Sequence, residues 1–354
     1  MEEQLDLQRI VSPLLCWYDQ SARVLPWREN PEPYRVWVSE IMLQQTRVEA
    51  VKPYYERFLS ALPTVDALAQ APEETLLKLW EGLGYYNRVR NLQKAAVLIM
   101  EQYDGVIPAS FESLLSLPGF GEYTAGAVAS IAFGLRVPCV DGNVLRVVSR
   151  LTADNRNMLD AKVKKQVTEV IRQILPERTG DFNQSLMELG ATVCLPNGAP
   201  LCDKCPLAGL CLAKKKGLMA SLPVKVSKKP RVIEERTVFV LCSGGQVALR
   251  RRPNRGLLAG LWELPSVSGK LTAEQAEKQL KDWGATDVNI CSLAPAKHIF
   301  SHREWHMAGF AAKEKEPFGD FIWVTDEELL RDVTLPSAFK SYAEFLKDWI
   351  SVDI

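Results

Sequence analysis

The stretch Leu117-Pro118-Gly119-Phe120-Gly121 decides how the first part of this chain should fold. Its two glycines let the backbone turn tightly and approach a ligand closely. The apolar helix expected after it would offer unpaired N–H groups and the positive end of its dipole to a phosphate. The sequence therefore predicts a phosphate-binding hairpin between two helices. The alternative is an ordinary glycine turn between packed helices, which the pattern of this short stretch favours when taken alone.

On both sides of this hairpin the chain has the pattern of an all-α region, which we expect to cover residues 1–212. Prolines and glycines separate the periodic segments. Apolar residues recur at helical spacing in six segments, which are 36–50, 66–81, 88–102, 122–133, 144–151 and 161–174.

Composition excludes several classes of protein. The chain has 354 residues, of which 47% are hydrophobic and 24% charged, so disorder over most of its length is excluded. Its apolar runs are shorter than the roughly 18 residues needed to cross a bilayer, and its acidic first residues do not resemble a secretory signal. We therefore expect a soluble, cytoplasmic protein without a membrane partner. The 43 basic and 43 acidic residues exclude a histone-like protein, but not local nucleic-acid binding.

The amino-acid composition of the chain changes after Cys211. Residues 213–233 are rich in lysine and proline and carry no acidic residue, which predicts a basic linker close to an anionic partner. From 234 to 354 we expect a mixed α/β domain. Two strands flank Gly244-Gly245, a two-residue hairpin signal. The expected strands are 237–243, 246–251, 287–293, 306–312 and 319–324, and the expected helices are 272–283 and 336–349.

Four cysteines, Cys194, Cys202, Cys205 and Cys211, are separated by seven, two and five residues. Four thiolates from one loop can enclose a [4Fe–4S] cluster, and structural zinc, which also takes four sulfurs, is the alternative. The spacing favours the cluster, because zinc sites more often pair two separate Cys-x2-Cys motifs. We expect the other four cysteines to be buried small hydrophobes; they are Cys16, Cys139, Cys242 and Cys291.

Glu40 is a carboxylate inside an expected helix, 36–48. Its helical neighbours Val36, Trp37 and Leu43 are apolar, so we expect burial to raise its pKa and to suit it for general acid chemistry. The alternative is a solvated stripe of polar residues, which the local pattern favours.

Asp141 follows an apolar run and precedes the helix 144–151. Capping that helix is its simplest role, and the pattern favours it. The helix dipole would also hold the carboxylate ionised. An ionised carboxylate is what a developing cation needs.

Taken in order along the chain, four motifs resemble one known family. They are Ser39–Thr46 (SEIMLQQT), the hairpin 117–121, Val140–Val144 (VDGNV) and the cysteine run. This set is similar to the endonuclease III superfamily of helix-hairpin-helix DNA glycosylases. Leu43-Gln44-Gln45-Thr46 and the C-terminal domain make it resemble the MutY family of adenine DNA glycosylases. The family usually has six residues between its first two cysteines, where this chain has seven.

The resemblance implies a multidomain fold. An all-α helix-hairpin-helix DNA glycosylase would consist of a six-helix lobe at about 26–135 and an iron–sulfur lobe at about 1–25 and 136–212. The C-terminal domain, 234–354, would be Nudix-like. Its helix 272–283 lacks the Arg-Glu-x-x-Glu-Glu pattern that holds Mg²⁺ in Nudix hydrolases, so we expect a domain that reads the lesion without hydrolysing nucleotides.

The implied activity is hydrolysis of the N-glycosidic bond of adenine mispaired with 8-oxoguanine or guanine, as part of base excision repair. Glu40 would protonate the base and Asp141 would stabilise the sugar cation, with Tyr123 and Asn143 orienting Asp141 and the sugar. Bifunctional relatives carry a lysine where this chain has Tyr123, which cannot form a Schiff base. The tyrosine therefore favours a monofunctional enzyme over the alternative, a pyrimidine DNA glycosylase with AP lyase activity.

The resemblance also implies a [4Fe–4S] cluster on the four cysteines and double-stranded DNA as the partner of a monomeric enzyme, which in a bacterium would associate with the nucleoid. It assigns DNA contacts to Leu43, Gln45, Thr46, Tyr85, Gly119, Gly121, Phe300, Ser301 and His302. Three residues would line the adenine pocket: Trp27, Arg28 and Gln184.

Overall fold

The computed structural model describes residues 5–224 and 230–350, and side chains up to residue 346. It separates into two compact units. One contains Met1–Ala71 and Asn87–Ser227, and the other contains Pro72–Tyr86 and Lys228–Ile354. The N-terminal residues 1–4 and part of the expected linker, 225–229, lie outside the described residues. The domain boundaries expected from the sequence remain a prediction.

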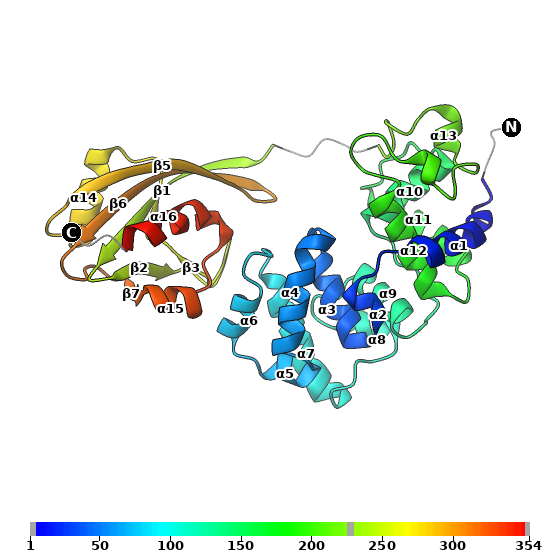
Figure 1. Ribbon diagram of the computed structural model, residues 1–354, viewed down its shortest axis with the longest axis horizontal. Coiled ribbons are helices and arrows are strands. Elements are labelled where there is room, and N and C mark those ends of the chain that lie inside the picture. The colour runs from blue at the N-terminus through cyan, green and yellow to red at the C-terminus, as the bar shows by residue number, and fades with distance from the viewer. Residues whose placement is uncertain (1–4, 225–229, 351–354) are drawn as a thin grey trace. The chain divides into compact units, whose positions relative to one another are not determined.

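The first unit is built from helices (Figure 1). A short 3₁₀ turn, Leu7–Ile10, precedes them, and another, Cys202–Lys204, lies in the cysteine loop. The helices are α1 Val11–Ser21, α2 Pro26–Glu29, α3 Pro33–Leu43, α4 Val48–Ala61, α5 Val65–Gln70, α7 Asn87–Tyr103, α8 Phe111–Ser116, α9 Glu122–Ile131, α10 Gly142–Thr152, α11 Ala161–Gln173, α12 Thr179–Thr192 and α13 Leu212–Lys216. The all-α character expected for this region is confirmed.

Two of the expected helices are each divided in two. The segment 36–50 breaks between α3 and α4, where Gln45 adopts a left-handed φ of 59° that ends α3. The segment 66–81 breaks at Pro72 between α5 and α6, Glu73–Leu79, because the residue before a proline is pushed out of the helical region. Several helices lie outside the predicted segments, among them α1 and α8, and the longest of these is α12. Its apolar residues Phe182, Leu186 and Leu189 recur at helical spacing. Polar residues such as Asn183 and Glu188 share the buried face with them, which weakens the periodic signal.

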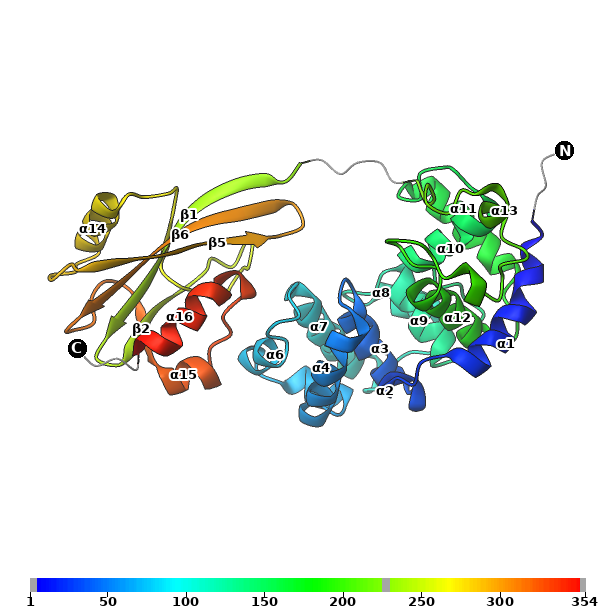
Figure 2. The same cartoon turned by 45° about the horizontal axis from the view of Figure 1, so that its top comes forward.

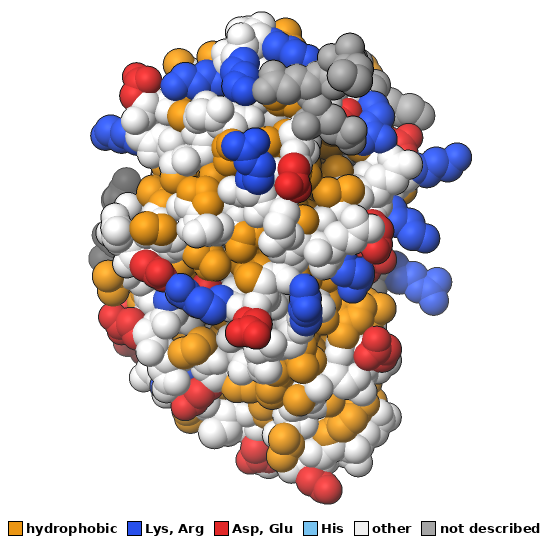
Figure 3. Space-filling model, turned by 90° about the vertical axis from the view of Figure 1, so that its right-hand side faces the viewer, with side chains coloured by type: hydrophobic (Ala, Val, Ile, Leu, Met, Phe, Trp, Pro, Cys, Tyr) orange, Lys and Arg blue, Asp and Glu red, His pale blue; other side chains and the backbone are white. Residues whose placement is uncertain are grey.

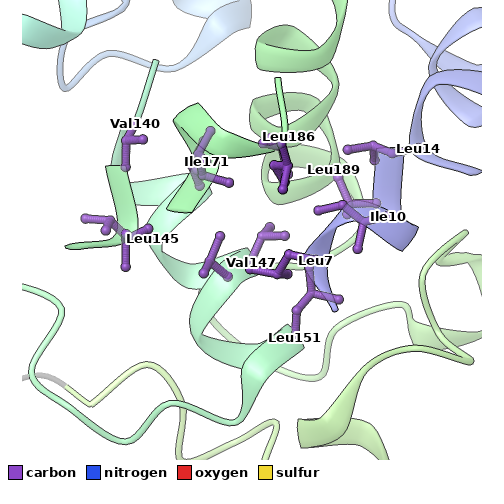
Figure 4. Packing of buried hydrophobic residues seen from close by; sticks show 14 of the residues in the cluster. Leu7, Ile10, Leu14, Val140, Leu145, Val147, Leu151, Ile171, Leu186 and Leu189 are labelled. Carbon is purple, nitrogen blue, oxygen red and sulfur yellow. The ribbon is translucent and has the colours of Figure 1, made fainter. Parts of the chain in front are cut away.

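One hydrophobic core joins the N-terminal residues to helices that come much later in the sequence (Figure 4). Helix α10 contributes Val147 and Leu151, and α12 contributes Leu186 and Leu189. Leu7, Ile10 and Leu14 close the cluster from the N-terminal side. This packing fixes α10 and α12 against each other. Gly190 makes the approach close, because a Cβ there would lie 2.6 Å from the Cβ of Asn143.

The second unit contains a mixed sheet with strand order β3-β2-β1-β6-β5, in which β1 and β6 are parallel. Strand β4 pairs with β1, and β7 pairs with β2. The strands are β1 Val232–Ser243, β2 Gln246–Arg251, β3 Trp262–Glu263, β4 Ser266–Ser268, β5 Ile290–Ile299, β6 Arg303–Glu314 and β7 Ile322–Thr325. The hairpin expected at Gly244-Gly245 is confirmed: both residues have positive φ, and Ser243 pairs with Gln246.

Helices cover both faces of this sheet (Figures 1 and 2). On β1, Val238 and Val240 face the core that includes α16, Lys340–Ile350, while Phe239 and Leu241 face the core that includes α14, Ala273–Asp282. Such alternation is what period-two side chains produce in a sheet buried on both faces. The unit also contains α6, a short helix α15, Asp326–Arg331, and a 3₁₀ turn, Ser337–Phe339.

Within the described ranges, none of the helices combines the length and the apolar character that crossing a bilayer would require.

Candidate active site

Helix α3 brings Glu40 to a cavity of about 570 Å³ in the first unit. The helix is buried on all sides from Val36 to Met42, and Glu40 itself is only 6% exposed. The guanidinium of Arg88 completes the C-terminal end of α3, because its Nη1 donates to the carbonyls of Ile41 (2.8 Å) and Gln44 (2.7 Å). The alternative of a solvated stripe is therefore wrong for Glu40.

The Glu40 carboxyl has an unusually high pKa. Burial is the main cause and the charge of Asp141 adds to it, while the Tyr123 hydrogen bond and the charge of Arg28 act in the opposite direction. The net result is a pKa of about 7. The expectation of a raised pKa is thus confirmed, and the carboxyl can carry a proton near neutral pH.

The resemblance led us to expect that Tyr123, on α9, would orient Asp141. In the structure Tyr123 instead orients Glu40. Its hydroxyl donates to Glu40 Oε2 at 2.7 Å and lies 3.3 Å from Met187 Sδ. Burial, followed by the charge of Glu40, raises the pKa of this hydroxyl well above its ordinary value, so the side chain stays neutral.

Asp141 caps helix α10, as its position in the sequence predicted. Its Oδ1 accepts from the backbone N–H groups of Asn143 and Val144, both at 2.8 Å, and its Oδ2 accepts from Asn143 Nδ2 at 2.6 Å. We expected the helix end to favour the ionised form. The net pKa is instead raised, because burial outweighs the hydrogen bonds from Val144 and Asn143.

The side-chain amide of Asn143 is held in place by Arg146, a buried residue that the sequence analysis did not identify. Arg146 Nη2 donates to Asn143 Oδ1 and to the Gly190 carbonyl, both at 2.8 Å, and its Nε donates to the Cys194 carbonyl at 2.8 Å. The sequence contained one signal that could have identified Arg146: it is a charged residue inside the apolar stripe of α10, next to Val147. This chain of hydrogen bonds fixes the amide of Asn143 so that it donates to Asp141.

Many of the predicted residues lie around this one cavity, although they come from distant parts of the sequence. Trp27 packs edge-on against Tyr55, with ring centroids 5.3 Å apart. The predicted residues that line the cavity are Trp27, Arg28, Glu40, Leu43, Gln45, Thr46, Gly121, Tyr123, Asp141, Asn143 and Gln184.

The hairpin before α9 has two glycines with different roles. Gly119 has φ of 81°, and a Cβ there would lie 2.9 Å from Asn91 Cβ, so both conformation and space require glycine. Gly121 caps α9 with extended backbone, and a Cβ there would meet nothing within 4 Å. Glycine is therefore not forced at 121, and its effect is to leave the start of α9 uncovered.

Two candidate DNA-contacting residues, Gln45 and Tyr85, have left-handed backbone conformations, with φ of 59° and 50°. Such conformations are costly for residues other than glycine and concentrate at functional sites. Gln45 is exposed, and Tyr85 is 48% exposed. In the second unit the Tyr85 hydroxyl lies 2.9 Å from Ser301 Oγ, so the structure brings these two predicted residues together.

The loop between β5 and β6 contains Phe300, Ser301 and His302. Phe300 is half-buried and packs edge-on between the rings of His298 (4.5 Å) and Trp305 (4.9 Å). Ser301 and His302 are exposed at the tip. Phe300 therefore anchors the loop, and the two residues after it are the ones available to a ligand.

The four clustered cysteines line one small cavity of about 30 Å³ beside the core that contains α10 and α12. All four are half-buried, and Arg150 Nη1 donates to Cys194 Sγ at 3.2 Å. Burial raises the pKa of Cys205 to about 11, and the other cysteines of the run add to the shift. Across residues 5–224 and 230–350, however, no group of three or more His, Cys, Asp or Glu side chains is arranged so that it could hold a metal ion.

The remaining cysteines only partly follow expectation. Cys139 and Cys242 are buried, as expected. For Cys16 and Cys291 the expectation of burial is wrong. Cys16 lies on the solvent side of α1, and Cys291 lies on β5, an outer strand of the sheet.

Basic side chains gather toward one end of the first unit. On the face drawn in Figure 3 they concentrate in its upper part, at the height where Figure 1 places α13. Lys214, Lys215 and Lys216 form the last turn of that helix. This region is therefore basic, although the net charge of the whole chain is zero.

The fold and the cavity define a DNA glycosylase of the helix-hairpin-helix class. Residues 38–173 match the family described as HhH-GPD superfamily base excision DNA repair protein, and residues 237–344 match the NUDIX domain family. Among solved structures, a thermostable thymine-DNA glycosylase is 30% identical, with a TM-score of 0.54 over 59% of this chain and 97% of that one. An endonuclease III in a non-covalent DNA complex, 24% identical with a TM-score of 0.51, shows the same fold over 60% of this chain and 96% of that one.

Comparison with curated relatives identifies the family within this class of DNA glycosylases. The adenine DNA glycosylase of Homo sapiens is 38% identical over 89% of this chain and 70% of its own length. That of Buchnera aphidicola subsp. Schizaphis graminum is 34% identical over 94% of this chain and 97% of its own length. The chain belongs to the adenine DNA glycosylase family, as the sequence resemblance indicated.

Proposed function

We propose that this chain is a monofunctional DNA glycosylase that hydrolyses the N-glycosidic bond of adenine paired with 8-oxoguanine, or with guanine, in duplex DNA. One observation carries the proposal: two buried carboxyl groups, Glu40 and Asp141, line a single cavity of about 570 Å³. That volume is within the range of pockets for small organic ligands. Because the glycosidic bond is hidden in a duplex, the adenine nucleotide must leave the stack and enter this cavity.

Glu40 acts as the general acid. Its pKa of about 7 keeps much of the population protonated at neutral pH, and transfer of the proton to N7 makes adenine a better leaving group. Tyr123 fixes the carboxyl by donating to Oε2. The second carboxyl oxygen is left to face the base.

Asp141 stabilises the positive charge that forms on the sugar as the bond to adenine breaks. Three hydrogen bonds, from two backbone N–H groups and from Asn143, fix the carboxylate before the substrate arrives. A charge held in place in this way stabilises a transition state without reorganising during the reaction. Water then adds to the sugar, as in glycoside hydrolysis with paired carboxylates.

We assign DNA contacts to each unit separately. The start of α9, left uncovered by Gly121, offers its N–H groups to a backbone phosphate. Gln45 and Tyr85 are suited to enter the opened base stack, and Leu43 and Thr46 stand beside the pocket. In the C-terminal domain, Ser301 and His302 would read 8-oxoguanine through its N7–H, a donor where guanine has an acceptor. We further propose that the protein acts as a monomer on chromosomal DNA. In a bacterium it would then be cytoplasmic or associated with the nucleoid.

The test is incubation with duplexes that contain adenine opposite 8-oxoguanine, with and without a final hot-alkali step. We expect strand breaks only after alkali, because Tyr123 has no amine to attack the sugar. A duplex with adenine opposite thymine is the matched control. Breaks without alkali would favour the bifunctional pyrimidine glycosylase and lyase, and the absence of abasic sites would indicate a protein that only binds the lesion.

We also propose that Cys194, Cys202, Cys205 and Cys211 hold a [4Fe–4S] cluster. The chemistry of the donor set fits this group, because four thiols from one loop line one cavity and Arg150 donates to one of the sulfurs, although among the described residues the thiols are not arranged around a common metal position. The cluster would chiefly order the loop 194–211 beside the basic turn of α13.

Purified protein is expected to contain about four iron atoms per chain, the stoichiometry of such a cluster, and to absorb visible light. Replacing Cys202 by serine should reduce both, whereas the same change at the exposed Cys16 should affect neither. Stoichiometric zinc with a colourless protein would contradict the proposal.

A further inference from the structure

One wall of the cavity is built around a buried carboxylate that the mechanism above does not use. Glu188, on α12, is 1% exposed. Its Oε1 accepts from Arg23 Nε at 2.6 Å and from the Arg23 backbone N–H at 3.2 Å. Its Oε2 accepts from Arg23 Nη2 and Arg28 Nη2, both at 2.8 Å. Glu188 thus joins the chain before α2, α2 itself and α12 at a single point.

This contact fixes the guanidinium of Arg28 on all sides. Arg28 Nη1 donates to the Arg23 carbonyl at 3.1 Å, and Nε donates to Gln184 Oε1 at 3.2 Å. The guanidinium carbon lies 5.5 Å from the centre of the Tyr18 ring. Each nitrogen of Arg28 therefore has a partner, and its position depends on Glu188 and Arg23.

The charges of this group do not cancel. Burial raises the pKa of Glu188, but the hydrogen bonds and charges of Arg23 and Arg28 outweigh it, so that the net pKa is lowered and the carboxylate stays ionised. One negative charge faces two positive charges. Of the two arginines, Arg28 is the one whose charge acts on Glu40.

Glu40 has charged or titratable neighbours on each element that packs against α3. Arg28 lies on α2, Tyr123 on α9, Asp141 at the start of α10, and Arg88 from α7 binds the carbonyl end of α3. On α4, Glu49 acts on Arg23. Of these, Arg28 is the neighbour whose position Glu188 sets.

We propose that Glu188, assisted by Arg23, is a positioning residue for base excision, which holds the Arg28 guanidinium in the cavity wall where it acts on Glu40 and on the extruded base. The inference rests on the proposed function, because it concerns the same reaction. Both carboxylate oxygens of Glu188 already accept hydrogen bonds from Arg23 and Arg28, so the effect of Glu188 on the reaction passes through these two residues.

A double-mutant cycle tests this dependence. Single-turnover excision is measured for the full-length wild type, Glu188→Gln, Arg28→Gln and the double variant. We expect Glu188→Gln to slow excision roughly ten- to hundredfold, as misplaced positioning groups do. In the Arg28→Gln background the same change should cost less than twofold, because residues that act as a unit are not additive. Equal costs in both backgrounds would overturn the proposal.

The pH profile supplies a readout that a purely structural role would not change. Because the charge of Arg28 lowers the pKa of Glu40, Arg28→Gln should move the alkaline limb of the excision rate to higher pH. Glu188→Gln should move it in the same direction, since an unanchored Arg28 spends less time beside Glu40. An unmoved limb, together with a lower melting temperature, would mean that Glu188 serves stability alone.

Matched variants keep the test sharp. Arg178→Gln removes surface ion pairs to Asp19 and Asp181 at the other end of α12, and should change neither rate nor profile. Glu188→Asp keeps the charge and should restore part of the rate. If Glu188→Gln does not fold, Arg23→Lys perturbs the same group from its more exposed side, and should shift the alkaline limb in the same direction.

The two proposals fail in different ways. A wild type without adenine excision would refute the proposed function, whereas additive costs in an active enzyme would refute only the positioning role.

Discussion

Replacing Asp141 by asparagine is expected to slow adenine excision on the order of 10³-fold or more, equivalent to about 4 kcal/mol of lost transition-state stabilisation. The substitution removes the negative charge that the sugar cation requires. It keeps a good helix cap, because the amide oxygen can still accept from the backbone of Asn143 and Val144. The fold should therefore survive while the chemistry fails.

The asparagine also creates a specific conflict. At the position of Oδ2 an amide nitrogen would face Asn143 Nδ2, which is also a donor. Turning the Asn143 amide would relieve the clash but would give up the bond from Arg146. Part of the loss should thus come from disorder of Asn143.

Single-turnover rates and affinity for a duplex carrying adenine opposite 8-oxoguanine check this prediction. Affinity should stay within a few fold of the wild type. Asp160→Asn is the matched control, because Asp160 caps α11 in the same way at an exposed position and should leave the rate unchanged. Near-wild-type excision by the Asp141 variant would remove Asp141 from the mechanism.

Replacing Glu40 by glutamine is expected to slow excision roughly 10²- to 10⁴-fold, the range for loss of a general acid. Glutamine keeps the size of the side chain and an oxygen that accepts from Tyr123, but it has no acidic proton to give to adenine. In the wild type the rate should fall as pH rises through about 7, because Glu40 then loses its proton. The residual activity of the variant should lack this alkaline limb.

Stability separates this loss from misfolding. The pKa of Glu40 is raised from 4.5 in the unfolded chain to about 7 in the native state, so the native state binds the proton more tightly. Glu40 therefore contributes a stability that is complete below pH 4.5 and is lost as pH rises to about 7, roughly 3 kcal/mol in all. Glutamine does not ionise and avoids this loss. Above pH 7 the variant should melt at or above the wild-type temperature, and a variant that is both inactive and less stable there would contradict this account.

The sequence predicted the architecture well where local patterns carry it. Helical periodicity and its breaks indicated the all-α unit, and Gly244-Gly245 indicated the β-hairpin. It failed for α12, because polar residues such as Asn183 and Glu188 share the buried face of this helix with its apolar residues and weaken the periodic signal. It also failed at 44–47, where a single left-handed residue, Gln45, ends one helix before the next begins.

By itself, the sequence determined the class of protein. The ordered motifs around Glu40, the glycine hairpin, Asp141 and the cysteines are local, and local chemistry is what a sequence displays directly. Only the tertiary structure decided which groups meet: that Tyr123 donates to Glu40, that burial outweighs the helix end in setting the pKa of Asp141, and that Glu188 holds Arg28. Desolvation and long-range pairing depend on what packs around a group from distant parts of the chain, and no local pattern contains that information.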